Sequence, residues 1–196
     1  MELAGGKAVL IGGDIGSEKH CKKIVARAVK EFGRLDILVN NAAYQRNYAK
    51  LEDISSGEFD KTMKTNIYAM FYLCQAALLH LRKGGSIINT SSIQSVSPSP
   101  GLVAYATTKG AISNFTAGLV GKRGIRVNSV APGPIWTPLI PATLPRGKAK
   151  TFGKQTPLGR AGQPAELAPA YVLLASDEGS YMTGAIVPVI GGEPIL

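Results

Sequence analysis

The sequence predicts an α/β protein with a mostly parallel sheet. Short apolar runs alternate with longer segments whose apolar residues recur at helical spacing, and glycine or proline separates them. The runs are almost continuously apolar, which is typical of parallel strands covered by helices on both faces. With 196 residues, 45% of them hydrophobic, the chain is long enough to form one domain with a real core, and we expect a single domain over 1–196.

The first elements lie before residue 40. The apolar run Lys7–Ile11 predicts a buried strand, which a Gly-Gly pair ends. A helix follows, because Ser17 is a plausible N-cap and Gly33 a plausible stop. The next strand is Leu35–Val39.

The same alternation continues along the rest of the chain and gives five strands in all. A proline-rich segment, Pro132 to Pro145, predicts an irregular loop. The remaining elements are a helix from about Glu58 to Leu81, a strand at Ser86–Asn89, a helix from Tyr105 to Val120, a strand at Ile125–Asn128, a helix near Pro164 to Ala175 and a strand at Ala185 to Val189.

The formal net charge is +9, and a basic balance is compatible with a nucleic-acid-binding module. However, the basic residues are scattered and lack interleaved aromatic residues, so we expect solvated faces and no nucleic-acid partner. The nucleic-acid interpretation stays open as a weaker alternative. The small basic groups are Lys122, Arg123 and Arg126, and Arg146, Lys148, Lys150 and Lys154.

We expect a cytoplasmic protein without a membrane span. The chain has no run of 18 apolar residues, and its first residues lack the layout of a signal peptide. Cys21 and Cys74 fall within apolar helical patterns, so we interpret both as buried structural residues. His20 and His80 have no carboxylate or cysteine partner at ligand spacing, so we predict no metal site.

A candidate catalytic group comprises Asn66, Ser92, Tyr105 and Lys109, which we expect to converge at the carboxyl ends of the strands. Tyr105 and Lys109 are four residues apart and therefore lie on one face of a helix. A neighbouring cation favours the phenolate, and a tyrosine with a pKa near 10 needs that help to transfer protons near neutrality. Ser92 stands thirteen residues before Tyr105, directly after a predicted strand.

Two further motifs follow strands: Asn40-Asn41-Ala42-Ala43 and the segment from Pro132 to Thr137. Together with the Ser, Tyr and Lys spacing and Asn66, they make the whole chain resemble the short-chain dehydrogenase/reductase family. Its glucose/ribitol dehydrogenase-like and general-stress members are the most similar. The resemblance implies hydride transfer between the nicotinamide of NAD or NADP and a carbonyl or alcohol carbon of a small polyol, sugar or aldehyde.

The resemblance also implies roles for the catalytic group. Tyr105 would be the acid/base, and Lys109 would lower its pKa and hold the nicotinamide ribose. Ser92 would bind the substrate oxygen, and Asn66 would support a water-mediated proton relay to Lys109.

Further roles concern binding. Tyr44, Gln45, Gln94 and Trp136 indicate a polar substrate site with aromatic walls, with Gln94 and Trp136 as the substrate residues. By the resemblance, the cofactor-binding residues are Asp14, Ile15, Asn40, Ala42, Tyr105, Lys109, Pro132, Gly133, Ile135 and Thr137.

The glycine-rich phosphate loop of the family has no counterpart in this sequence. Asp14 precedes Asn40 by 26 residues, an interval that resembles the one between the family's third strand and its Asn-Asn-Ala-Gly motif. We therefore expect a Rossmann-like doubly wound parallel sheet that lacks its first two strands and their helices, a single incomplete domain. In the order 3-2-1-4-5-6 this leaves a gap. Either Lys7–Ile11 moves in beside Leu35–Val39, or another chain fills the gap, or the open edges promote aggregation.

Three consequences follow from this expectation. The preference between NAD and NADP is unreadable, because the residue that sets it is absent. A catalytically inactive truncated remnant, acting as a binding or assembly partner, is the alternative function. Finally, Arg126 follows Lys109 by 17 residues, about three fewer than in relatives, so we expect a possible homo-oligomer to be weakened.

Overall fold

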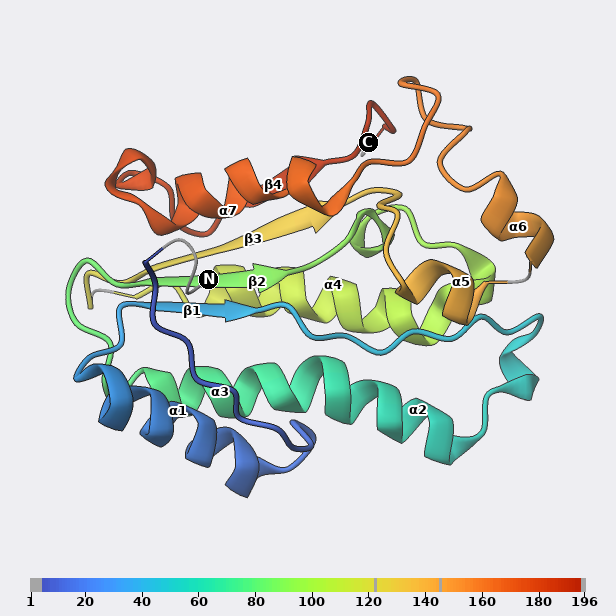
Figure 1. Ribbon diagram of the computed structural model, residues 1–196. Helices are drawn as coiled ribbons and strands as arrows, with labels where there is room; N and C mark the ends of the chain where they lie inside the picture. The colour runs from blue at the N-terminus through green and yellow to red at the C-terminus, as the bar shows by residue number, and fades with distance from the viewer. Residues whose placement is uncertain (1–4, 122, 145, 195–196) are drawn as a thin grey trace.

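The computed structural model describes residues 5–121, 123–144 and 146–194, and of Arg146 and Lys148 only the backbone. A four-stranded parallel sheet forms its centre (Figure 1), with the strands side by side in chain order. The register places Ile37 opposite Ser86 and Ser86 opposite Arg126. The strands are β1 (Ile37–Asn40), β2 (Ser86–Thr90), β3 (Arg126–Pro132) and β4 (Ile186–Val189).

Helices cover both faces of this sheet, as the apolar strands predict. α1, α3 and α4 pack on one face and α7 on the other (Figure 1). Successive residues of β2 point to opposite faces, so Ile87 packs into the core under α3 and α4, and Ile88 packs against Leu174 of α7. The helices are α1 (Glu18–Phe32), α2 (Ser56–Met63), α3 (Ala69–Ala77), α4 (Val103–Gly118), α5 (Leu139–Thr143), α6 (Arg146–Lys150) and α7 (Ala168–Ala175).

The ends of α1 confirm the capping prediction. The Ser17 hydroxyl accepts a hydrogen bond from the backbone N–H of His20, and Gly33 ends the helix with a φ of 77°, a conformation that glycine adopts without strain. Cys21 and Cys74 are buried free thiols, as predicted.

The prediction of a strand at Lys7–Ile11 is wrong. This segment forms no ladder with β1, whose only partner in the described chain is β2, and Leu10 is 98% exposed. An apolar run becomes a strand only when a neighbouring strand takes its backbone hydrogen bonds, and none does so here. The sheet therefore has four described strands, not five, and the segment has not moved in beside β1.

Two other predictions need correction. The helix expected from Glu58 to Leu81 is helical only to Ala77, and its middle, Lys64–Tyr68, is a π-helix between α2 and α3. The segment Pro132 to Pro145 is not wholly irregular, because it contains α5; Pro141 lies in the first turn of α5, where its missing N–H is not needed. Pro145 lies outside the described residues.

Short 3₁₀ turns complete the fold. One, Pro164–Glu166, leads into α7, so the helix predicted near Pro164 to Ala175 is confirmed with a 3₁₀ start. The others are Leu51–Asp53, Ile93–Ser95, Pro100–Leu102 and Asp177–Gly179.

Arg126 holds the end of α7 against the sheet. Its guanidinium donates from Nη1 to the carbonyl of Leu174 at 2.8 Å and from Nη2 to that of Ser176 at 3.0 Å. These are carbonyls that a helix leaves unpaired at its C-terminus. Arg126 is thus a structural residue, which corrects the expectation that it lies on a solvated face.

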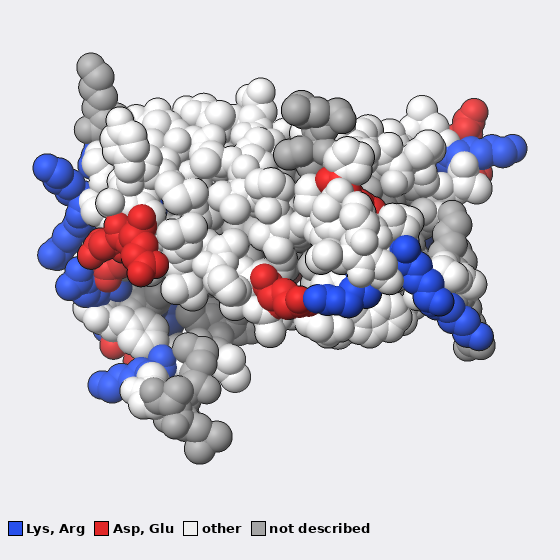
Figure 2. Space-filling model, turned by 90° about the horizontal axis from the view of Figure 1, so that it is seen from above, with Lys and Arg blue, Asp and Glu red and all other residues white. Residues whose placement is uncertain are grey.

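The other basic residues agree better with solvation. Arg123, Lys150 and Lys154 are exposed, whereas Lys122 and the side chains of Arg146 and Lys148 lie outside the described residues. On the face above α7, Figure 2 shows a broad area without charged side chains. Among the described helices, none has the length and apolar character that a membrane crossing needs.

Candidate active site

A cleft of about 1600 Å³ opens at the carboxyl ends of the strands. Segments that follow all four strands form its walls, together with the start of α4, part of α5, and α7 with the segment that precedes it. Open parallel sheets bind their ligands at this edge. The predicted residues that line the cleft are Ala42, Gln45, Ser92, Gln94, Tyr105, Lys109, Pro132, Gly133, Ile135 and Thr137.

Ser92 is placed by the end of β2. It is the N-cap of the 3₁₀ turn Ile93–Ser95, and its Oγ accepts a hydrogen bond from the backbone N–H of Gln94 at 3.2 Å. Its hydroxyl lies 3.5 Å from the carbonyl of Pro132 and also interacts with the Tyr105 phenol. Ser92 is therefore placed beside the phenol, where both hydroxyl groups can reach one ligand oxygen in the cleft.

Tyr105 and Lys109 lie one turn apart on α4, as the spacing predicts. The Nζ of Lys109 is 5.2 Å from the centroid of the Tyr105 ring and donates to the carbonyl of Thr90 at 2.6 Å. The Lys109 side chain is only 2% exposed. An ammonium has three N–H donors, so two remain for a ligand.

Burial controls the protonation of both groups. It raises the pKa of Tyr105 to about 12, and the hydrogen bond with Ser92 acts in the opposite direction. Burial also lowers the pKa of Lys109 to about 8. The resemblance implied a Tyr105 pKa lowered by Lys109; in this structure desolvation of the phenol is the larger effect and raises it.

Asn66 is buried within the π-helix and hydrogen-bonds to the backbone of the segment after β1. Its Oδ1 accepts from the backbone N–H of Tyr44 at 2.7 Å, and its Nδ2 donates to the Tyr44 carbonyl at 2.9 Å and to Thr108 Oγ1 at 3.0 Å. We call these three hydrogen bonds the Asn66 clasp, because they fix the backbone at Tyr44 against α4. The side chain of Asn66 makes no direct hydrogen bond to Lys109 in the described structure, so the proton relay stays a prediction.

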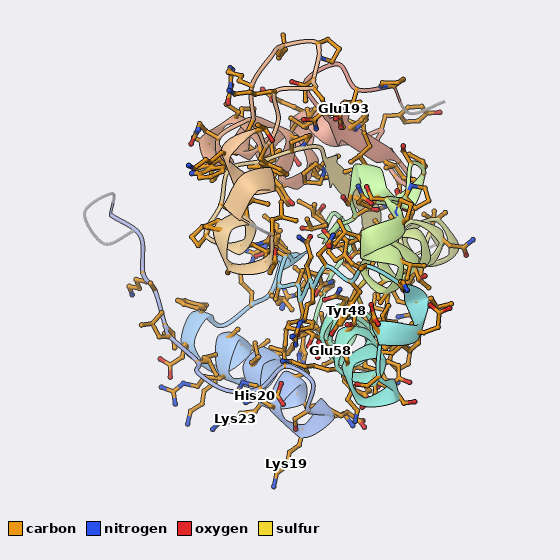
Figure 3. All side chains as sticks on the ribbon, turned by 90° about the vertical axis from the view of Figure 1, so that its right-hand side faces the viewer. Lys19, His20, Lys23, Tyr48, Glu58 and Glu193 are labelled. Atoms are coloured by element: carbon orange, nitrogen blue, oxygen red, sulfur yellow. The ribbon has the colours of Figure 1, made fainter. Side chains whose placement is uncertain are left out.

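A polar cluster around Glu58 is a feature that sequence reasoning missed. The Tyr44 hydroxyl donates to Glu58 Oε1, and Arg46 Nη1 lies 3.4 Å from Oε2. These contacts, first that of Tyr44, hold the pKa of Glu58 below its usual value. Figure 3 shows Tyr48 close to Glu58, which lies on α2. No sequence motif indicated this cluster, since its members come from a loop and a helix ten or more residues apart.

Four predicted binding residues do not line the cleft. Asp14 is exposed and accepts a hydrogen bond from the backbone N–H of Gly16. Ile15 and Asn40 line an adjoining small cavity of about 80 Å³, which shares Asn41, Ala42 and Thr90 with the cleft. Asn40 Nδ2 donates to Asn89 Oδ1 at 2.8 Å. Trp136 is not among the lining residues; its ring lies 6.4 Å from that of Phe152, which does line the cleft.

The residues fit one half of a nicotinamide dinucleotide. Lys109 offers two ammonium donors inside the cleft, and Ile135 and Thr137 line the same space, as a nicotinamide ribose and carboxamide require. Of the residues expected at the adenosine half, Ala42 lines the cleft, Ile15 and Asn40 line the adjoining cavity, and Asp14 lines neither. In the described part of the chain, no group of three His, Cys, Asp or Glu side chains is arranged to hold a metal ion.

Comparisons with known proteins agree with this picture. A family model described as enoyl-(acyl carrier protein) reductase matches residues 1–193. An uncharacterised oxidoreductase of Bacillus subtilis, YhdF, is 53% identical over 190 residues, which are 95% of this chain and 66% of that protein. The glucose and ribitol dehydrogenase of Daucus carota is 46% identical over 187 residues, 94% of this chain and 64% of that protein.

A solved structure is also similar. The short-chain dehydrogenase of Burkholderia cenocepacia in complex with NADP has a TM-score of 0.89 and 32% identity, covering 97% of this chain and 78% of that one. The chain spans about two thirds of the length of the two curated relatives named above.

The fold and the site define a Rossmann-like α/β protein with a Ser, Tyr and Lys group at the carboxyl edge of its sheet. The chain belongs to the short-chain dehydrogenase/reductase family. The expected cofactor, NAD or NADP, agrees with the comparison, because the similar solved structure holds NADP.

Proposed function

We propose that this chain carries the catalytic site of an NAD(P)-dependent oxidoreductase that acts on the carbonyl or alcohol group of a small polyol, sugar or aldehyde. The observation that carries this proposal is the meeting of Ser92, Tyr105 and Lys109 in one cleft. The names of the similar proteins support an oxidoreductase and a polyol or sugar substrate.

The cofactor, when bound, supplies or accepts a hydride. With a pKa of about 12, Tyr105 is protonated at neutral pH, so it is ready to donate a proton to a carbonyl oxygen. Ser92 donates a hydrogen bond to the same oxygen as negative charge builds on it. The remaining N–H donors of Lys109 bind and orient the hydroxyl groups of the nicotinamide ribose. In the oxidative direction, the phenol takes the proton back.

The alternative is a catalytically inactive chain that serves as a binding or assembly partner. Asp14 and Asn40 would hold the adenosine half of the cofactor, but Asp14 is exposed and the Asn40 amide is bonded to Asn89, which favours this candidate. A cytoplasmic location and a homo-oligomer weakened by the short α4 stay predictions.

The first test is titration of the purified chain with NADH and NADPH, followed by fluorescence, together with turnover of glucose, ribitol and small aldehydes. We expect saturable binding, and turnover that falls about 10²- to 10⁴-fold in Tyr105→Phe, because this variant removes the proton donor. Cofactor binding should be unchanged in that variant. Absence of binding at millimolar cofactor would instead support the inactive alternative.

A further inference from the structure

We propose that Gln45 is a specificity-determining residue that accepts a hydrogen bond from a hydroxyl group of a neutral, polyhydroxylated substrate. This inference rests on the proposed function and names the group that selects the substrate class. It follows from three observations: the fixed backbone around Gln45, the orientation of its carboxamide, and the small number of cationic side chains in the cleft.

The backbone around Gln45 is fixed on both sides. The preceding residue, Tyr44, is gripped through its N–H and its carbonyl by Asn66. Further along, the backbone N–H of Tyr48 donates to the carbonyl of Gly101 at 2.9 Å. The side chain of Gln45 is 7% exposed and lines the cleft. Its carboxamide is therefore presented from a pre-organised segment, as a recognition residue requires.

Hydrogen bonding fixes the direction of the carboxamide. The Thr143 hydroxyl donates its only proton to the carbonyl of Leu139 at 2.6 Å. It can therefore only accept from Gln45, whose Nε2 lies 3.1 Å from Thr143 Oγ1. The nitrogen faces α5, and the oxygen Oε1 faces elsewhere.

Oε1 of Gln45 has no hydrogen-bond partner in the described part of the chain. It is also absent from the set of fully buried side-chain atoms that lack a partner, so its surface is accessible. It is thus open to the cleft and free to accept. The second N–H of Nε2 is a donor without a partner among the described residues. A hydroxyl group both donates and accepts, so it matches this pair.

Two other glutamines line the cleft, and each is already engaged. The Oε1 of Gln94 accepts from the backbone N–H of Ser99, and its Nε2 donates to the Ser99 hydroxyl. Gln155 donates to Glu193, which Figure 3 shows far from Glu58 on the opposite side of the site. Gln155 is exposed, so Gln45 is the buried glutamine with a free acceptor among the described lining residues.

The charges of the cleft favour a neutral ligand. Lys109 is the only lysine or arginine among the described lining residues, and the proposed function commits its two remaining N–H donors to the nicotinamide ribose. A substrate carboxylate or phosphate would enter without a further cation to pair with, and an unpaired buried charge is costly. Neutral hydroxyl groups need no such partner.

The test measures binding without turnover. In a Tyr105→Phe background, the affinities for ribitol and for 1,5-pentanediol are compared by ligand-observed NMR; both have five carbons, but the diol lacks the three inner hydroxyl groups. We expect ribitol to bind about tenfold more tightly, and we expect Gln45→Met to abolish this preference. Gln75→Met, at an exposed position of α3, is the matched control and should keep it.

An unchanged preference in Gln45→Met, or no preference in the parent chain, would overturn the proposal. An equal loss of affinity for both ligands would do the same, because it would show a merely structural role. If Gln45→Met fails to fold, Thr143→Val decides: releasing the carboxamide should reduce the preference several-fold, and an intact preference rejects the assignment. A chain that binds ribitol selectively but never turns over refutes only the proposed activity.

Discussion

Lys109 is a single active-site residue whose burial lowers the stability of the folded chain. Its ammonium is buried to 2% exposure, with one carbonyl as its partner, because the cleft needs a cation beside the phenol. Burial disfavours the charged form and lowers the pKa from 10.5 to about 8. Between these pH values the unfolded chain binds a proton that the folded chain lacks, so stability rises with pH there.

We therefore expect the free energy of unfolding to rise by up to about 3 kcal/mol between pH 8 and 10.5 through Lys109. Lys109→Met should remove this rise and should be more stable than the wild type at pH 7. Urea unfolding at several pH values measures both effects, with the exposed Lys23→Met as control. Above pH 10 the raised pKa of Tyr105 acts in the reverse direction and lowers stability. A slope that persists in Lys109→Met would assign the effect to another group.

Asn66 is a second residue whose role is specific. Asn66→Ala removes three hydrogen bonds and leaves the N–H and carbonyl of Tyr44 without these partners. We expect a loss of about 2–4 kcal/mol in the free energy of unfolding, because buried groups left unpaired each cost about 1–3 kcal/mol. The exposed Asn114→Ala, on α4, is the control and should change stability by less than about 0.5 kcal/mol. Equal values for the two variants would show that the clasp contributes nothing.

At the scale of elements, the end of β3 passes close to the segment after β4. A Cβ atom on Gly133 would lie 2.8 Å from the Cα of Ile190, a backbone atom that cannot move away alone. Gly133→Ala should therefore cost about 1–3 kcal/mol and displace one wall of the cleft. Gly118→Ala, at the end of α4 with open space around it, should be neutral or slightly stabilising. Thermal unfolding of the pair tests this, and equal midpoints would contradict it.

The elements that the sequence predicts well are those whose own residues determine them. Ser17 and Gly33 bound α1 by local hydrogen bonding and φ, and β2 and β3 form where apolar runs meet neighbours. The prediction of a strand at Lys7–Ile11 is wrong because a strand needs a neighbouring strand to pair with, and the apolar run alone does not show whether one is present. The Tyr105 and Lys109 spacing places both in the cleft, whereas the π-helix, the Glu58 cluster and the Gln45 contact depend on residues far apart in the chain.

At the scale of the whole molecule, the outer edge of β1 has no partner among the described residues. Ile37 on this strand is 42% exposed, and Leu10 lies in the unpaired apolar segment. Open edges and exposed apolar runs promote association. We expect concentration-dependent association in sedimentation experiments, reduced in a Leu10→Ser and Ile37→Lys double variant. A wild-type chain that stays monomeric at high concentration would contradict this expectation.

The side-by-side order of the strands has a consequence for how the molecule is made. Because β1 to β4 are neighbours in chain order, each strand that leaves the ribosome finds its partner already synthesised. The sheet can therefore grow by one strand at a time during translation. The cleft is completed later, since Gln45 forms its hydrogen bond with Thr143 only after a further 98 residues have been synthesised. A nascent chain would therefore form most of its sheet before the Gln45 carboxamide is oriented for ligand binding.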